Sequence, residues 1–449
     1  MSQLIIVTSK YLISAMLVVF VITSVILLFI QGRKKICSML YYLQIALIIA
    51  CHFVGFHTLA TKFDDIKLYY IYATELILIF AMIVFFRLIY PKCSRFLLNL
   101  MCMMFTIGSI ILARLSIDKA IRQFVIAIIS FLIALIIPYI IKKFKSIKEW
   151  WLLYATLGIS VLALVLVVGS VTYGSKISFH ILRISFQPSE LIKIVFVAFL
   201  ACILSRPYKF INIIIATIGA SLHIVILVLS RDLGSSLIYY FAFMIMVYVA
   251  TKKIWMLLAG SGVLVASSYV AYNLFSHVQI RVSAWKNPWL DLDDTGYQIT
   301  QSLFAIGTGG LFGLGLGEGT PASIPLASKD FIFSAISEEM GAISAICLVF
   351  IILICFLWML YISSILEDKF YSLVVLGIGI TYVFQAFLTI GGGIKFIPLT
   401  GVALPFISYG GTSVMTTMFM FALVQGIYIY CIDNKKGKKR KRVVRKIKA

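Results

Sequence analysis

The sequence predicts an all-α polytopic membrane protein, and three observations support this class. Of the 449 residues, 62% are hydrophobic and only 12% are charged, whereas a water-soluble domain carries roughly 25% charged residues. Apolar stretches of about 20 residues, the length that crosses a bilayer as a helix, recur along most of the chain. Short basic connections separate many of these stretches. Lipid is therefore expected to cover most of the protein surface.

The apolar stretches predict about thirteen membrane-spanning helices. The first stretch is too long for a cleavable signal peptide and is followed by three basic residues, Arg33, Lys34 and Lys35. We expect the spans near residues 11–31, 39–57, 67–89, 96–116, 122–141, 149–171, 189–205, 210–229, 234–251, 253–275, 331–360, 369–390 and 411–432.

The distribution of charge predicts the orientation of these spans. The net charge is +22, and ten of the basic residues lie between Lys435 and Lys448. The other basic clusters fall on alternate connections, which indicates an external N-terminus, a cytoplasmic C-terminus and an external connection over 276–330. The basic tail, residues 433–449, is expected to lie near anionic membrane lipids. A nucleic-acid partner is not expected, because the charge lies in loops and the tail rather than on a water-soluble basic face.

The long external connection contains three acids in four residues, Asp291, Asp293 and Asp294, flanked by Trp285 and Trp289. Three interpretations stay open from the residues alone. The acids can form a solvated turn, one of them can be a general base at headgroup depth, or the D-x-D-D pattern can bind Mg²⁺ or Mn²⁺. A short interfacial helix is expected over 298–306, followed by a Gly-rich stretch over 307–319.

Ionisable residues inside predicted spans are costly unless they are paired or face water. Glu190 and Lys193 are three residues apart on a helix that Pro188 can begin, so we expect an ion pair. Glu338 and Glu339 begin a span and, as neighbours in sequence, are not expected to share a face, so only one needs to face a cavity. Further charges near spans are Arg114, for which an interhelical bond or a position at the interface is expected, and Asp232, which precedes an apolar stretch.

Five sequence motifs together resemble the SEDS family, the FtsW, RodA and SpoVE type of peptidoglycan glycosyltransferase. In chain order they are ISFQPSELIKI, DLGSSL, NPWLD followed by GYQITQSLFAIGTGG, KDFIFSAISEEMG, and PLTGVALPFISYGGTS. The resemblance implies the family's ten-helix core over residues 96–432. It leaves residues 1–95 as about three extra membrane-spanning helices for which no motif gives a role.

The resemblance also implies a function, which is to polymerise lipid II on the outer face of a bacterial cytoplasmic membrane during cell division, elongation or sporulation. Asp291 aligns with the family's proposed base. Arg281, Lys329 and Lys395 are the candidates to neutralise the lipid diphosphate. Within the motifs, further substrate contacts are expected from Glu190, Lys193, Asp232, Glu338, Glu339, Ser408 and Tyr409.

The family's usual partner, a class B penicillin-binding protein transpeptidase, is expected, and no cofactor beyond a possible divalent cation (Mg²⁺ or Mn²⁺). Two departures from the family pattern affect the local geometry of the site. The residues after Asp291 replace a usual Pro and Gly, and Ser230-Arg231 replaces a usual Gln-Pro. The alternatives are a lipid II flippase, which needs no base, and a non-catalytic scaffold for a transpeptidase.

Overall fold

The computed structural model describes residues 2–448 except 31, 173–174, 182–183 and 291–295. Within this part of the chain, twelve helices are long and apolar enough to cross a membrane, and a further helix of 17 residues, α7 (Pro188–Leu204), packs among them. Each overlaps one of the predicted spans, so the polytopic helical class is confirmed. The twelve are α1 (Ser2–Phe29), α2 (Lys34–Phe63), α3 (Lys67–Ile89), α4 (Arg95–Leu115), α5 (Ile117–Lys143), α6 (Trp151–Val168), α8 (Phe210–Leu229), α9 (Leu233–Thr251), α10 (Ile254–Leu274), α13 (Ile332–Ser364), α14 (Lys369–Gly393) and α15 (Gly411–Lys448).

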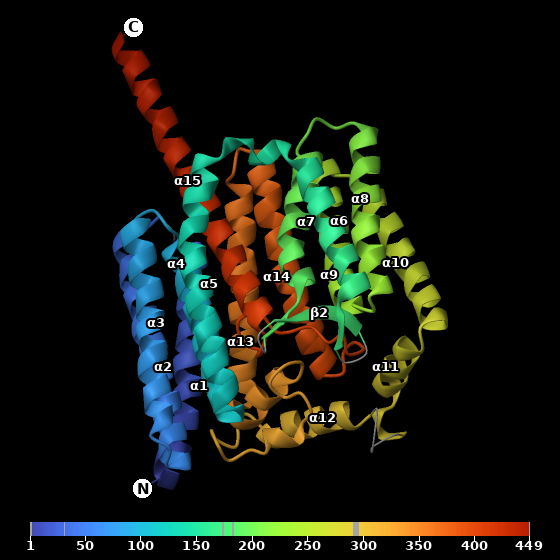
Figure 1. Cartoon of the computed structure of the whole chain (residues 1–449). Helices are drawn as coiled ribbons and strands as arrows, with labels where there is room; N and C mark the ends of the chain where they lie inside the picture. Colours follow the sequence, from blue (N-terminus) through green and yellow to red (C-terminus); the bar gives the residue numbers. More distant parts are fainter. Residues whose placement is uncertain (1, 31, 173–174, 182–183, 291–295, 449) are drawn as a thin grey trace.

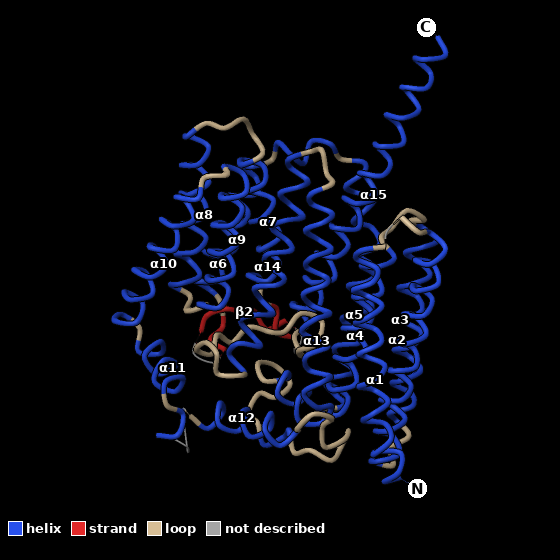
Figure 2. The backbone as a smooth tube through the Cα atoms, turned by 180° about the vertical axis from the view of Figure 1, so that it is seen from behind, coloured by secondary structure: helices blue, strands red, loops and turns tan. Residues whose placement is uncertain are grey.

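The long helices run side by side along one common direction (Figure 1). Helices α1–α3 form one side of the bundle and α8–α10 the other, and the view from behind shows the same order (Figure 2). The N-terminus lies at the same end as α12, while α15 projects from the opposite end. The last part of α15 covers most of the predicted tail, which therefore continues the final helix.

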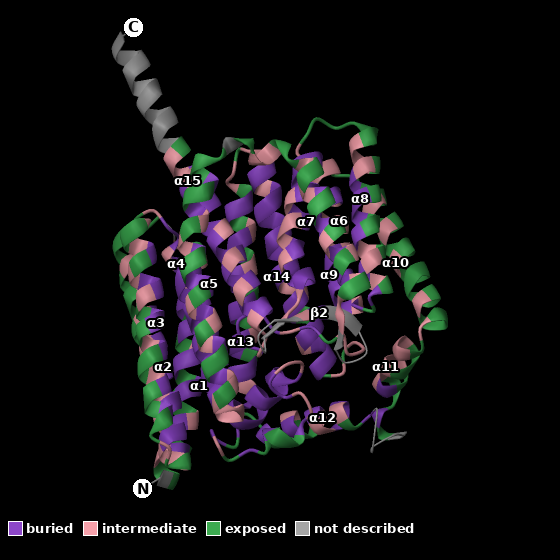
Figure 3. Cartoon of the chain, viewed as in Figure 1, coloured by how far each residue is buried: buried purple, intermediate pink, exposed green. Residues whose placement is uncertain are grey.

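Burial varies strongly between helices (Figure 3). Every residue from Phe96 to Ala113 in α4 is buried, and this helix contacts α2, α3, α5 and α13. In contrast, α10 has no buried residue. Because the backbone groups of a spanning helix are satisfied within the helix, a fully exposed apolar helix is stable when lipid covers it. Helix α4 is thus the central support of the bundle, and α10 lies at its lipid-facing edge.

A small sheet that the sequence did not predict follows α6. Strands β1 (Ser170–Thr172), β2 (Ser175–Ile181) and β3 (Ile184–Phe186) pair antiparallel in the order β1–β2–β3. The predicted span over 149–171 ends early, because Gly169 at the end of α6 is extended and β-branched residues follow it. The sheet lies toward the end of the bundle that carries α11 and α12 (Figure 1).

The described residues of the long connection over 276–330 form several short elements. The connection contains α11 (Ser276–Lys286), the short 3₁₀ turns η2 (Pro288–Leu290) and η3 (Pro321–Ser323), and α12 (Tyr297–Gly309). Helix α12 confirms the helix predicted over 298–306, and its place at the membrane interface stays a prediction; α11 was not predicted. Between α12 and η3 runs the Gly-rich segment, defined here as residues 310–320.

Helix α13 is broken at Gly341, whose backbone has φ 84° and ψ 168°. The break frees backbone groups on both sides, and the Gly-rich segment binds them. In a membrane such groups need a partner within the protein, because lipid offers none. The four bonds, at 2.9–3.1 Å, run from Leu314 N to Glu338 O, Gly315 N to Glu339 O, Ala342 N to Gly310 O and Ile343 N to Leu311 O.

Candidate active site

Residues of four of the sequence motifs meet in polar networks at the ends of α7, α9, α14 and α15. Pro188 occupies the first turn of α7, where its missing N–H costs nothing. Asp232 precedes α9, and its side chain accepts a hydrogen bond from Ser235 N, which caps that helix. Tight helix starts of this kind place the neighbouring polar side chains in fixed positions.

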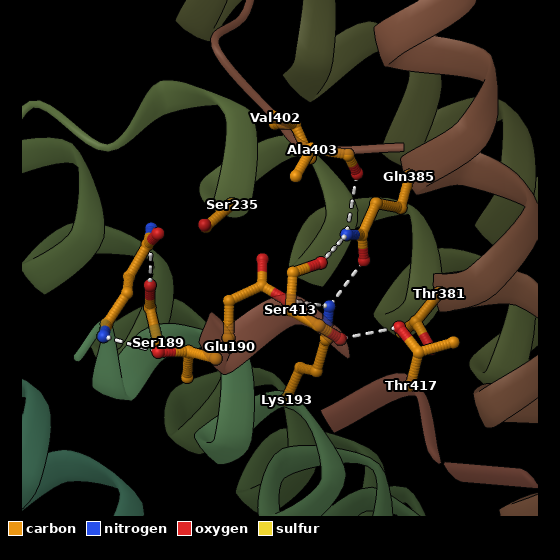
Figure 4. A network of polar contacts seen from close by, with 12 residues as sticks. Ser189, Glu190, Lys193, Ser235, Thr381, Gln385, Val402, Ala403, Ser413 and Thr417 are labelled. Carbon is orange, nitrogen blue, oxygen red and sulfur yellow. Dashed lines mark hydrogen bonds and ion pairs between the residues drawn. The ribbon is translucent and has the colours of Figure 1, made fainter. Parts of the chain in front are cut away.

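The predicted ion pair between Glu190 and Lys193 is present (Figure 4). Lys193 Nζ lies 2.7 Å from Glu190 Oε2, and the two residues are only 2% and 6% exposed. Lys193 also donates to Gln385 Oε1. Gln385 in turn donates to Ala403 O at 2.9 Å and to Ser413 Oγ at 3.2 Å. The buried charges are therefore neutralised within the chain, and they tie α7 to α14 and to the connection before α15.

Asp232 joins the starts of α7 and α9. Its Oδ1 accepts from Ser235 N at 3.1 Å, and its Oδ2 accepts from Ser189 Oγ at 3.0 Å and from Gln187 Nε2 at 3.2 Å. These bonds hold the carboxylate among protein donors. A direct contact of Asp232 with substrate remains a prediction.

Ser408 and Tyr409 bind the connection before α15 to the end of the 276–330 connection. Ser408 Oγ donates to Lys329 O at 2.5 Å and accepts from Leu404 N at 2.9 Å. Tyr409 N donates to Ser328 O at 2.7 Å. Lys119 of α5, which the sequence analysis did not select, donates to Ser328 Oγ at 2.9 Å and lies 5.8 Å from the centroid of the Tyr409 ring. A cation from α5 thus sits beside the motif residues.

Arg281 of α11 reaches the same connection. One of its guanidinium nitrogens donates to Leu399 O at 3.2 Å and to Thr400 O at 3.3 Å. Burial lowers the pKa of Arg281, while the carboxylates of Asp330 and Asp232 raise it. Burial also raises the pKa of Asp330 to about 6, and Lys329 and Arg281 oppose that shift. Two of the three predicted diphosphate ligands, Arg281 and Lys329, thus lie within electrostatic range of one carboxylate that was not predicted.

Lys395, the third predicted diphosphate ligand, follows α14 and has φ 61°. Its carbonyl accepts a hydrogen bond from Trp285 Nε1 at 3.1 Å. Trp285 belongs to α11, so this bond fixes the start of the loop that contains the three acids. Trp289, which also precedes the acids, packs on Phe304 of α12 with their ring centroids 5.7 Å apart, the spacing of an aromatic pair.

Asp291, Asp293 and Asp294 lie outside the described residues, so their roles as base, turn or metal ligands stay predictions. Among the residues that are described, no three His, Cys, Asp or Glu side chains lie close enough to hold a metal ion. The divalent-cation interpretation of the D-x-D-D pattern therefore depends on the undescribed acids.

Glu338 and Glu339 both lie beside the Gly-rich segment, although as neighbours in sequence they bind different partners. Glu338 Oε1 accepts from Thr320 N at 2.9 Å. Glu339 Oε1 accepts from Arg114 Nε at 2.8 Å, and the same guanidinium donates to Gly319 O at 3.0 Å. The segment wraps across the helix at its break, so both carboxylates meet it. The expected interhelical bond of Arg114 is confirmed.

Comparison with known proteins gives a consistent result. The sequence profile of the FtsW/RodA/SpoVE family, described as cell cycle proteins, matches residues 93–431. The peptidoglycan glycosyltransferase RodA of Mycobacterium tuberculosis is 34% identical over 273 residues, which cover 57% of this chain and 58% of that protein. Stage V sporulation protein E of Bacillus subtilis is 35% identical, and the match covers 61% of this chain and 77% of that protein. The probable peptidoglycan glycosyltransferase FtsW of Escherichia coli is 34% identical, and the match covers 67% of this chain and 75% of that protein. The chain thus spans little more than half the length of its mycobacterial relatives.

Solved structures share the fold. A chain from a peptidoglycan synthase complex, studied for the coordination of polymerization and crosslinking, matches with a TM-score of 0.64 at 22% identity. It covers 75% of this chain, and 97% of that chain is matched. The Rod shape determining protein RodA of Thermus thermophilus matches with a TM-score of 0.56 at 20% identity, covering 75% of this chain and 96% of that one.

Proposed function

Because the chain belongs to the FtsW/RodA/SpoVE family of cell cycle proteins, the SEDS family, we propose that it is a peptidoglycan glycosyltransferase that polymerises lipid II. The relatives whose names state this activity support the proposal. The multi-pass helical fold supports it as well, because a lipid-linked substrate reaches its enzyme within the membrane.

In the proposed reaction a sugar hydroxyl of the incoming lipid II attacks the anomeric carbon of the growing glycan. The new glycosidic C–O bond forms while the C–O bond to the lipid diphosphate breaks, and the diphosphate leaves with the electron pair. Asp291 accepts the proton of the attacking hydroxyl. Arg281, Lys329 and Lys395 offset the negative charge of the leaving diphosphate.

The observation that most supports the proposal is the contact between α11 and the connection after α14. The segment before Asp291 is fixed at two points to the connection that follows α14, through Arg281 at Leu399 and Thr400 and through Trp285 at Lys395. Helix α11, which carries Arg281 and precedes Asp291 in the chain, is therefore anchored by short contacts to the connection that carries Lys395. Such anchoring is what a reaction between two bound lipids requires.

We extend the proposal to orientation and partners. The 276–330 connection and the N-terminus face the outside, and the C-terminus faces the cytoplasm, where the basic tail meets anionic lipid. Their positions at opposite ends of the bundle support this arrangement (Figure 1). A class B penicillin-binding protein is the proposed partner, supported by the match to a chain of a synthase complex. A divalent cation (Mg²⁺ or Mn²⁺) is proposed only with the acids around Asp291 as its ligands.

The experiment is to incubate the purified chain alone with lipid II and to follow glycan length on gels. Elongation without any partner is the expected result. A flippase would move lipid II across proteoliposomes without lengthening glycan, and a scaffold would need an added polymerase. Either of these outcomes contradicts the proposed activity. Chelation by EDTA in the same assay tests the cation.

A further inference from the structure

Two of the three extra helices, α1 and α2, contact the Gly-rich segment directly. Lys62, near the end of α2, forms an ion pair with Glu318 at 2.5 Å. From α1, Lys10 Nζ donates a hydrogen bond to Gly313 O at 3.2 Å. The neighbouring Tyr11 ring lies 4.9 Å, centroid to centroid, from the ring of Phe312 in the segment. Both α1 and α2 therefore hold the segment, which also binds α13.

The second contact of α2 reaches the buried charges beneath the segment. The ring of Phe63 lies 5.1 Å from the Arg114 guanidinium. Arg114 is the residue that pairs with Glu339 and donates to Gly319 O. A cation between an aromatic face and a carboxylate is held in one position. The end of α2 thus supports the ion pair that fastens the segment to α13.

The fit between these elements is close. Ser14 of α1 and Ser344 of α13 have their hydroxyl oxygens 3.1 Å apart, just beyond the break in α13. A Cβ atom on Gly315 would lie 2.8 Å from an Ile6 methyl carbon, and one on Gly317 would lie 2.8 Å from the side chain of Lys62. The glycines therefore allow the segment to lie directly against α1 and α2.

We propose that α1 and α2 are a built-in positioning unit, a clamp formed by Lys10, Tyr11, Lys62 and Phe63 that holds the Gly-rich segment. The inference rests on the proposed function. Helix α12 joins the loop containing Asp291 to this segment, so the clamp fixes one end of the helix that leads to the candidate base. The side chains of Lys62 and Glu318 are 30% and 38% exposed. Because such an exposed pair contributes little to global stability, its loss should loosen the segment rather than unfold the protein.

Hydrogen exchange in the Gly-rich segment tests the clamp without reference to activity. The informative amides are those of Leu314 and Gly315, which are bound to carbonyls at the break of α13. In Lys62→Glu and in Glu318→Lys, exchange over 310–320 should accelerate by roughly five-fold, as expected for local opening. The double variant with both charges exchanged should return to the parental rate.

A matched control is Lys148→Glu, which breaks the ion pair between Lys148 and Asp368. The side chains of these two residues are 35% and 31% exposed. That pair links other elements of the bundle, so exchange over 310–320 should stay parental. Parental exchange in both clamp variants would overturn the clamp.

The same variants are then assayed for lipid II polymerisation, with Asp291→Asn as the inactive reference. Each single variant should lower kcat roughly ten-fold, while KM stays within about two-fold because the substrate contacts are intact. The charge-exchanged double variant should recover most of the kcat, which mere loss of folded protein would not do. If exchange behaves as expected but the parent makes no glycan, the proposed function fails and the clamp stands. If the parent polymerises and the single variants match it in kcat, the clamp has no positioning role.

Discussion

At the scale of single residues, the charged groups of the candidate site already bind other parts of the chain. Asp232 accepts three hydrogen bonds, and one nitrogen of Arg281 donates to two carbonyls. A guanidinium has five N–H donors, so Arg281 can hold this connection and still present donors to a diphosphate. Asp232 has both oxygens engaged within the chain, so its bonds fix the starts of α7 and α9 relative to each other.

The role of Asp291 gives the sharpest prediction. Asp291→Asn keeps the size of the side chain but accepts no proton at neutral pH, so polymerisation should fall by roughly 10²–10⁴-fold. Asp293→Asn and Asp294→Asn are the matched controls and should keep substantial activity. Initial rates of glycan synthesis, measured at equal levels of folded protein, decide the matter. A joint requirement for Asp291 and Asp293 that excess Mg²⁺ partly rescues would indicate a metal site instead.

The buried pair predicts a different pattern. Glu190→Gln or Lys193→Met each leaves one uncompensated charge in the bundle, at a cost of about 3–5 kcal/mol of stability. The double variant should melt close to the parent, although its activity need not recover, because Lys193 also holds Gln385. Thermal unfolding in detergent measures this.

As a control for that pair, Lys148→Met breaks the half-exposed pair with Asp368 and should cost no more than about 1 kcal/mol. Parental melting of both buried single variants would show that water reaches the pair.

Some site residues could not be selected from the sequence, for physical reasons. Lys119 stands in a charged stretch at the start of a span, where it resembles an ordinary interfacial lysine. Gln385 is one neutral amide inside an apolar stretch, and only packing brings it to Lys193. Asp330 lies within a quoted motif, but its proximity to Arg281 depends on how α11 folds back. In contrast, the Glu190–Lys193 pair was predictable because its spacing is local.

At the scale of elements, long apolar helices were predictable and short or broken elements were not. The sheet strands are three to seven residues long, too short for a clear alternating pattern. Helix α11 reads SHVQIRVSAWK and has no apolar face that would reveal it. The break at Gly341 lies within one predicted span. It is visible only in the backbone angles of Gly341 and in the backbone bonds to the Gly-rich segment.

The broken helix predicts that one glycine is indispensable. Gly313 has φ 80°, and a Cβ atom there would lie 2.3 Å from Glu339 O. Gly313→Ala should therefore destabilise the protein by at least about 1–3 kcal/mol, the cost of strained backbone alone. The matched control is Gly307→Ala in α12, where an added Cβ meets nothing within 4 Å. This substitution should stabilise the helix by about 0.5–1 kcal/mol. Melting temperatures of the two variants should move in opposite directions, and equal values would contradict the close packing at the break.

At the scale of the whole molecule, the elements proposed for chemistry gather at one end of the bundle. The described parts of the 276–330 connection and the N-terminus share that end (Figures 1 and 2). The basic connections predicted to be cytoplasmic lie toward the other end, where Lys92 and Lys142 pair with Asp433 of α15. This separation agrees with the thirteen predicted spans, since an odd number of crossings places the two termini on opposite sides. The family match from residue 93 begins after α3, so three crossings precede the matched region and reverse the side of the N-terminus relative to the start of that region.

The side of catalysis is therefore testable with three tags. An epitope at the N-terminus and one in an exposed position of the 276–330 connection should bind antibody on intact cells, and one after Ala449 should bind only after permeabilisation. Ala322, exposed in η3, marks a suitable position in the connection. A truncation that begins before α4 and lacks α1–α3 provides the internal control, because its new N-terminus should become cytoplasmic while the connection stays outside. If the C-terminal tag is accessible on intact cells, the assignment is reversed. The acids of the loop would then face the cytoplasm, and external polymerisation by this chain would be ruled out.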